Sequence, residues 1–255
     1  MSRLDRTYFR TGPANVYRRE RLTGTVTTAG TDAIVGAATL FTTELVVGDV
    51  IIIEGETLPL VVEAITDATH LTTVTAAATS ASGKTIDADI NLGYLDEGLE
   101  VSSDAGDSIE MKGAQAGTTI LGRVLSGLGK TIVKCEMKQI SVENIKRAFP
   151  NSGAVTISTT KKGIAIKPRP GYDMVTYSKP LVVKPILAGT ETTDKNKWVF
   201  APLAHPTGAG FSLSFNNTDQ QKFTAEFECF PDIANATEAD VTLIFGDPTL
   251  WGYVV

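Results

Sequence analysis

Two segments in which apolar and charged residues alternate constrain the fold more than any other feature of the sequence. In "TIVKCEMKQ", residues 131–139, and "KFTAEFECF", residues 222–230, one set of alternate positions is apolar and the other is mostly polar or charged. Because successive side chains of a strand point to opposite faces, both segments are predicted strands with one buried face. Val133, Cys135, Phe223 and Phe227 are therefore expected in the core.

The C-terminal half of the chain adds further strand-like segments and one helix. In "ISVENIKRAFP", residues 140–150, Ser141 is the expected N-cap, Glu143 lies in the first turn, and Pro150 ends the helix. The helix is short, so packing against a sheet must stabilise it. The predicted strands are "AVTISTT" (154–160), "GIAIKPR" (163–169), "KPLVVKPIL" (179–187), "KWVFAPLAHP" (197–206), "GFSLSFN" (210–216) and "DVTLIFGDP" (240–248).

Residues 22–88 differ in composition from the rest of the chain. They are rich in Thr, Val, Ile and Ala, which favour strands. Turn signals at residues 29–30, 47–49, 54–56 and 81–83 separate several short antiparallel strands. We therefore predict three parts: a basic N-terminal arm (1–21), a small inserted β-barrel or sandwich domain (22–88) and a main β domain (89–255). His70 is expected at the surface or at a strand end.

Residues 113–130 are predicted to be a long hairpin loop, because five glycines lie between two strand-like segments. Its apolar residues and one arginine are candidate contacts between subunits: Ile120, Leu121, Arg123, Val124, Leu125 and Leu128. The end of this stretch, "GLGKT", is not a phosphate-binding loop, because Val124 stands where that motif needs glycine and a strand is expected to follow.

The sequence offers no pattern typical of a catalytic or metal site, so no catalytic residue, metal or cofactor is expected. Its two histidines and two cysteines are far apart, and no known nucleophile motif is present. Glu226 and Glu228, on the polar side of one predicted strand, can be read as a carboxylate pair or as a solvated sheet face; the second interpretation is favoured. No apolar run is long enough for a membrane span, and no signal peptide is expected.

The positive charge of the chain is concentrated near its N-terminus. Residues 1–21 hold six arginines and two acidic residues, whereas the whole chain has a net charge of −6. Such an arm can bind nucleic acid or an acidic neighbouring copy. The arginines are Arg3, Arg6, Arg10, Arg18, Arg19 and Arg21.

From residue 89 onward, the order of features resembles the tail tube proteins of tailed bacteriophages. The resemblance rests on "NLGYLDEGLEVSSDAGDSIEMKG" (91–113), on "GKTIVKCEMKQISVENIKRAF" (129–149) and on "KFTAEFECFPD" followed by "DVTLIFGDP". It covers residues 1–21 and 89–255, whereas residues 22–88 depart from the family pattern and are similar to small β modules inserted in phage virion proteins.

The resemblance implies a β-sandwich with one flanking helix, six copies of which form a ring. Stacked rings would make the tube through which DNA leaves the capsid without sequence-specific binding, in contact with tape measure, tail terminator and distal tail proteins. The protein would be assembled in the host cytoplasm and reside in the virion tail, without membrane contact. Glu136, Glu226 and Glu228 are then candidates for the lumen, and Arg3, Arg6, Arg10, Arg18 and Arg19 for arm contacts.

Two alternatives remain open at this point. One is the tube protein of a related contractile injection or secretion system, which shares the implied architecture. The other is a stand-alone β-sandwich binding module, which would be expected to carry an exposed aromatic platform. Because an insert projecting outward would obstruct a sheath, a non-contractile tail is favoured.

Overall fold

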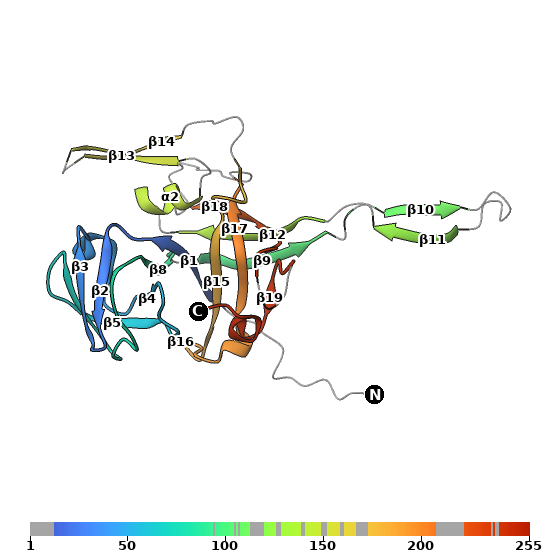
Figure 1. Ribbon diagram of the computed structural model, residues 1–255. Coiled ribbons are helices and arrows are strands. Elements are labelled where there is room, and N and C mark those ends of the chain that lie inside the picture. Colours follow the sequence, from blue (N-terminus) through green and yellow to red (C-terminus); the bar gives the residue numbers. More distant parts are fainter. Residues whose placement is uncertain are drawn as a thin grey trace. The chain divides into compact units, whose positions relative to one another are not determined.

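The computed structural model describes residues 13–93, 95–104, 106, 108–112, 120–125, 129–138, 141–148, 152–158, 161–166, 173–207, 222–235, 237 and 240–255. The fold is mainly β, and the strands of the described residues pair antiparallel (Figure 1). The chain divides into two compact units. Unit 1 contains Met1–Tyr94, Ser178–Leu203 and Pro231–Val255, and unit 2 contains Leu95–Tyr177 and Ala204–Phe230.

The first half of unit 1 is a sheet whose strand path returns to its starting point. The strand order is β7-β2-β3-β6-β5-β4-β8, and a single residue, Thr85, separates β7 from β8 in the chain. The first and last strands of this path, β7 and β8, are therefore consecutive in the chain, and β8 also pairs with β1. The elements are β2 (Thr25–Ala29), β3 (Ala33–Ala37), α1 (Phe41–Glu44), β4 (Val50–Ile53), β5 (Leu60–Ile65), β6 (His70–Thr73), β7 (Ser80–Lys84) and β8 (Ile86–Asn91).

This part of unit 1 has a hydrophobic core of its own. Every buried residue of the core lies between residues 22 and 88, and Phe41 of α1 is fully buried within it. Two partly buried residues, Ile65 and Ile90, pack against the cluster. The core consists of Leu22, Val26, Ile34, Phe41, Leu45, Ile51, Ile53, Leu60, Val62, Leu71, Ala77, Ile86 and Ala88.

Three of the four turns predicted in this segment lie between regular elements, and the fourth prediction is wrong. Gly30, Gly48 and Gly55 all have positive φ and lie outside strands. Gly83, in the predicted turn 81–83, lies inside β7 instead, where its φ of 65° accompanies a register shift between β7 and β2. Glycine here produces an irregular strand rather than a chain reversal. His70 begins β6 and is exposed, as predicted.

The second half of unit 1 is built on strand β1 (Ala14–Arg21), which pairs with β8 on one side and with β15 (Lys179–Leu187) on the other. Residues 14–21 of the predicted arm are therefore a strand of the sheet. The remaining elements are β16 (Thr190–Glu191), η2 (Lys195–Lys197), β19 (Ile244–Phe245), η3 (Pro248–Trp251) and the first part of β17 (Val199–Pro206), whose last three residues belong to unit 2. A second core contains Val182, Trp198, Phe200, Ile244 and Val255.

Unit 2 contains a sheet with the order β18-β12-β9, formed by β9 (Leu95–Ser103), β12 (Thr131–Met137) and β18 (Phe223–Phe230). The alternation predicted for β12 and β18 is confirmed, because Val133, Cys135, Phe223 and Phe227 are all buried. The predicted helix is α2 (Val142–Ala148), and Ser141 Oγ accepts a hydrogen bond from the Asn144 amide at 3.0 Å.

Two further hairpins belong to unit 2, and one of them corrects a prediction. Strand β10 (Ser108–Lys112) pairs with β11 (Ile120–Leu125), and β13 (Ser152–Ser158) pairs with β14 (Lys161–Ile166). Residues 120–125, assigned to a continuous loop from the sequence, are thus a strand. Residues 113–119 and 126–128, with Leu128, lie outside the described residues, as does the predicted strand 210–216. Among the described residues, no helix has the length and apolar character needed to cross a membrane.

Candidate assembly surfaces

The three glutamates predicted to face a lumen lie together on the polar face of the β18-β12-β9 sheet. In the register of β12 and β18, Glu136 is opposite Thr224, Lys134 is opposite Glu226, and Ile132 is opposite Glu228. All three glutamates are half-buried, on the face opposite the buried phenylalanines. The prediction that they avoid the core is confirmed, and their place in a lumen stays a prediction.

Lysine side chains lie close to these glutamates. This proximity was not predicted from the sequence. Lys222 Nζ lies 3.0 Å from Glu136 Oε2, and Lys130 Nζ lies 3.4 Å from Glu228 Oε1. Lys134 stands between Glu226 on β18 and Glu100 on β9 in the cross-strand register. Opposite charges at such cross-strand positions stabilise a sheet modestly. This face is therefore a mosaic of both signs rather than a uniformly acidic surface.

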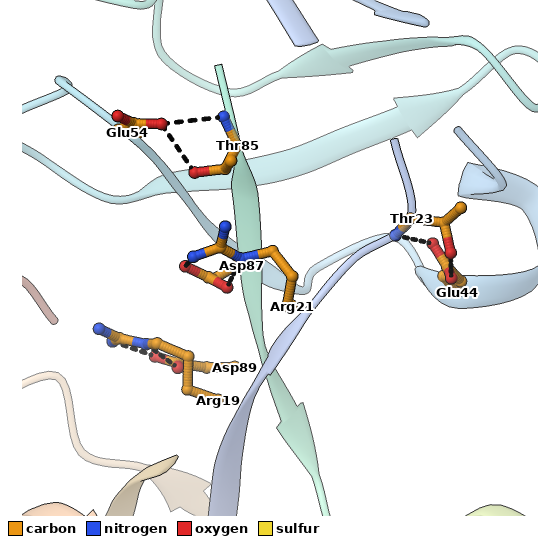
Figure 2. A network of polar contacts seen from close by, with 8 residues as sticks. All are labelled: Arg19, Arg21, Thr23, Glu44, Glu54, Thr85, Asp87 and Asp89. Atoms are coloured by element: carbon orange, nitrogen blue, oxygen red, sulfur yellow. Dashed lines mark hydrogen bonds and ion pairs between the residues drawn. The ribbon is translucent and has the colours of Figure 1, made fainter. Parts of the chain in front are cut away.

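The arginines of β1 have partners within the chain (Figure 2). Arg19 makes two hydrogen bonds to the Asp89 carboxylate, at 2.8 and 3.1 Å, and a third to the carbonyl oxygen of Val254 at 2.9 Å. Arg21 binds both oxygens of Asp87 at 2.6 and 3.2 Å. Because β1 and β8 are antiparallel neighbours, each arginine lies directly opposite its aspartate.

Arg18 also has a carboxylate partner, because its Nη1 lies 3.0 Å from Glu20 Oε1 on the same strand. Contact of Arg18 and Arg19 with a neighbouring subunit stays a prediction, and both side chains already serve the fold of unit 1. Arg3, Arg6 and Arg10 lie outside the described residues.

Unit 1 contains a buried polar cluster that was not predicted from the sequence. The Lys184 Nζ of β15 lies 4.4 Å from the ring centroid of Tyr17 and 4.8 Å from that of Trp198. Burial lowers the pKa of Lys184 and raises that of Tyr17, whose hydroxyl donates a hydrogen bond to Glu191. A lysine between two aromatic rings is held by cation–π attraction. The cluster joins β1, β15 and β16 and has a structural role here.

Most of the residues predicted to contact another subunit lie in one strand. Ile120, Leu121, Arg123, Val124 and Leu125 form β11, in which Val124 pairs with Ile109 and Arg123 pairs with Glu110. The β10–β11 hairpin is a separate two-stranded sheet. Their contact with another subunit stays a prediction.

Large apolar side chains also remain exposed near the C-terminal end of unit 1, and their exposure was not predicted from the sequence. We call this the C-terminal apolar surface; it consists of Ile233 (76% exposed), Phe245 (67%), Leu250 (74%) and Trp251 (38%). No local pattern predicts this surface, because "DVTLIFGDP" resembles any half-buried strand. Among the described residues no other comparable stretch of unit 1 outside residues 22–88 exposes four large apolar side chains.

The cysteines and possible metal ligands offer no chemistry in the described part of the chain. Burial raises the pKa of both Cys135 and Cys229 to about 12, so neither thiol is a nucleophile at neutral pH. No group of three or more His, Cys, Asp or Glu residues there could hold a metal ion. Comparison with protein-family models, with curated proteins and with solved structures finds no match for this chain.

Proposed function

We propose that this protein is a virion structural protein that assembles into stacked hexameric rings, the tail tube of a bacteriophage. The observation that carries the proposal is strand β9, nine residues long, at the end of the strand order of unit 2. Among the described residues, no strand pairs with its outer edge. An open edge of this length invites pairing with another chain, and a ring in which each copy covers the next removes the edge.

The polar face of the same sheet supports a role as a conduit wall. Its glutamates and lysines are interspersed, so a passing DNA strand meets neither a continuous cationic surface that would hold it nor an apolar one. In this proposal, Glu136, Glu226 and Glu228 face the lumen. The tape measure, tail terminator and distal tail proteins are the expected partners, and the virion tail is the expected location.

The finer fold belongs to the same proposal. Residues 22–88 are a small closed β-barrel inserted into the main domain, and the remaining strands form the tail-tube sandwich with α2 at its flank. The closed strand path through Thr85 and the separate hydrophobic core of residues 22–88 support the inserted barrel.

The alternatives differ in what they need from the structure. A tube of a contractile injection or secretion system would use the same edge and face. A binding module needs an exposed aromatic platform: Trp198 belongs to the second core of unit 1 and is 7% exposed, whereas Phe245 and Trp251 are exposed. We propose assembly over a stand-alone binding module because of the edge of β9, which no described strand covers.

Electron microscopy of the purified protein, with sedimentation of the same samples, tests the proposal. The wild-type chain is expected to form rings or tubes. Ser102→Lys places a charge on the exposed side of the edge strand β9 and should suppress assembly. Thr224→Lys adds the same charge to the same face on the inner strand β18 and serves as the matched control. A wild-type chain that stays monomeric at every concentration would refute the proposal.

A further inference from the structure

We propose that the C-terminal apolar surface of unit 1 binds the N-terminal segment, residues 1–12, of a second copy of this chain. The inference rests on the proposed self-assembly and names the surface that receives the arm. Four observations carry it: how the surface is built, its charge, the chemistry of the segment, and the place where the segment leaves the fold.

The surface is fixed by hydrogen bonds that leave its apolar side chains outward. Asn235 Nδ2 donates to the Trp251 carbonyl oxygen at 3.0 Å, and Tyr253 Oη donates to Asp232 Oδ2 at 2.9 Å. The Asp247 carboxylate accepts from the Thr249 amide at 2.9 Å and so caps η3. Residues 232–235 and 247–253 are thereby held together. Exposed Ile233, Leu250 and Trp251 are therefore held in place rather than carried on a loose tail, and an ordered apolar surface of this kind is typical of an interaction site.

The segment that carries this surface is also acidic. Residues 231–255 contain four carboxylate side chains and neither lysine nor arginine. Asp240 is exposed, and Asp232 and Asp247 are half-buried. Of the neighbouring lysines, Lys195 Nζ donates to the Val255 carbonyl oxygen of this segment at 2.8 Å, and Lys197 lies 3.4 Å from Asp194. An apolar surface with acidic neighbours suits a ligand that is both apolar and basic.

Residues 1–12, "MSRLDRTYFRTG", have this chemistry. They hold three arginines and one aspartate, together with Leu4, Tyr8 and Phe9. Arginine and aromatic side chains are enriched among the residues that dominate protein interfaces. The arginines of β1 pair with carboxylates of their own chain. The positive charge that complements the acidic segment therefore comes from Arg3, Arg6 and Arg10.

Residues 1–12 precede β1 at the end of the sheet where the C-terminal apolar surface lies. The Pro13 carbonyl oxygen accepts from the Ile186 amide, Ala14 is opposite Pro185, and Val199 is opposite Phe245. Strands β1, β15, β17 and β19 are successive neighbours there, so about 14 Å separates β1 from β19. Twelve extended residues reach at most about 40 Å, which exceeds this separation.

A peptide-binding experiment on the full chain tests the inference separately from tube formation. The receptor is the full chain carrying R3E, R6E and R10E, whose own arm no longer competes for the surface. The probe is a fluorescently labelled peptide of residues 1–12, followed by anisotropy. We expect saturable binding that weakens as salt rises, because charge pairs contribute to it. Adding Leu250→Asp should weaken binding about tenfold or more, as loss of an apolar anchor does.

Matched controls exclude trivial causes. Leu58, on the 22–88 segment, is 67% exposed, so Leu58→Asp should leave peptide binding unchanged. A peptide with its three arginines replaced by glutamate should bind about tenfold more weakly or not at all. Far-UV circular dichroism shows that each receptor is folded. Trp251→Ala, which removes a partly exposed side chain, gives a second receptor with the same expected loss of binding.

The outcomes separate this inference from the proposed function. Binding of the peptide with the expected variant effects supports the arm site, whether or not the wild-type chain forms tubes. Tubes without peptide binding would overturn the arm site alone. A third outcome is that the wild-type chain is monomeric and does not bind the peptide, whereas the arm variant does. The segment would then occupy the surface of its own copy, and the assignment to a second copy would be overturned.

Discussion

At the scale of single residues, two neighbouring ion pairs of unit 1 differ in burial and therefore in energetic role. The Asp89 side chain is 3% exposed, whereas the Arg21 side chain is 51% exposed. Removing one partner of a buried pair leaves an uncompensated charge and typically costs about 3–5 kcal/mol. We therefore expect Arg19→Ala to lower the free energy of unfolding by about that amount, measured by urea denaturation with tryptophan fluorescence.

The adjacent pair provides the control for this prediction. Arg21→Ala removes the same side chain from the same strand, but its partner Asp87 is partly solvated. Exposed pairs contribute about 0–1 kcal/mol, so this variant should unfold nearly as the wild type does. Equal losses in the two variants would contradict the role assigned to burial.

Glu56 makes a second residue-scale prediction, which concerns pH. Burial raises the pKa of its carboxyl, but hydrogen bonds from Thr79 and Ala78 outweigh this effect and hold the pKa below its ordinary value. A lowered folded-state pKa gives stability that is present above the unfolded-state pKa and is lost as pH falls through the folded-state value. Glu56→Gln should therefore destabilise by about 1–3 kcal/mol at pH 7.

The difference between Glu56→Gln and the wild type should then shrink below about pH 4, since the unfolded-state pKa of glutamate is about 4.3. Chemical denaturation at several pH values measures this difference. Glu63→Gln, at an exposed position on β5, is the matched control and should show no such trend. A difference that stays constant down to pH 3 would argue against the assigned hydrogen bonds.

At the scale of elements, the sequence predicts strands whose burial alternates and misses those whose pattern is broken. Strands β12 and β18 have alternate apolar residues, so both their existence and their buried face could be predicted. Glycine interrupts the pattern in β7 and β11, at Gly83 and Gly122, and both segments were assigned to turns or loops. In β1, arginines occupy both faces, so the segment shows no apolar alternation; the aspartate partners of Arg19 and Arg21 lie on β8, which is distant in sequence.

The β10–β11 hairpin carries an element-scale prediction. Its strands pair with each other, and the chain on either side is already joined by the hydrogen bond from the Asp104 amide to the Lys130 carbonyl oxygen at 2.9 Å. Replacing residues 105–129 by Asn-Gly should close β9 and β12 with a two-residue turn and leave the sheet folded. If the hairpin contacts the next ring, this deletion should abolish tubes.

Circular dichroism melting and electron microscopy measure the two consequences of this deletion. The unchanged β9–β12 register should preserve a cooperative transition near that of the wild type. Tubes of normal length from a folded deletion variant would refute the contact role of Ile120, Leu121, Arg123, Val124 and Leu125. An unfolded variant would instead show that the hairpin supports unit 2.

At the scale of the whole molecule, the candidate surfaces were predictable only in part. The polar face of β12 and β18 follows from local alternation, and its glutamates could be found from the sequence. Their lysine partners, such as Lys222 beside Glu136, depend on strand register, which no local pattern specifies. The C-terminal apolar surface depends on which apolar residues remain uncovered after folding, which composition does not reveal.

The separate core of residues 22–88 leads to the last prediction, that this segment folds without the rest of the chain. All thirteen buried residues of that core lie inside the segment, and its strand path closes through Thr85. A domain of about 65 residues can bury enough apolar surface to fold alone, although with a small margin. A fragment of residues 22–92 should therefore unfold cooperatively on heating, with dispersed amide signals in NMR spectra.

The reciprocal variant makes this prediction decisive. Arg21 lies opposite Asp87 in the β1–β8 register, so a two-residue turn can replace residues 22–86 and keep these strands paired. Without residues 22–86, the rest of the chain should keep the Arg19–Asp89 pair and the second core. It should still assemble if residues 22–88 are a projecting module. A fragment that stays unfolded, beside a remainder that also fails to fold, would show that the two cores form one cooperative structure.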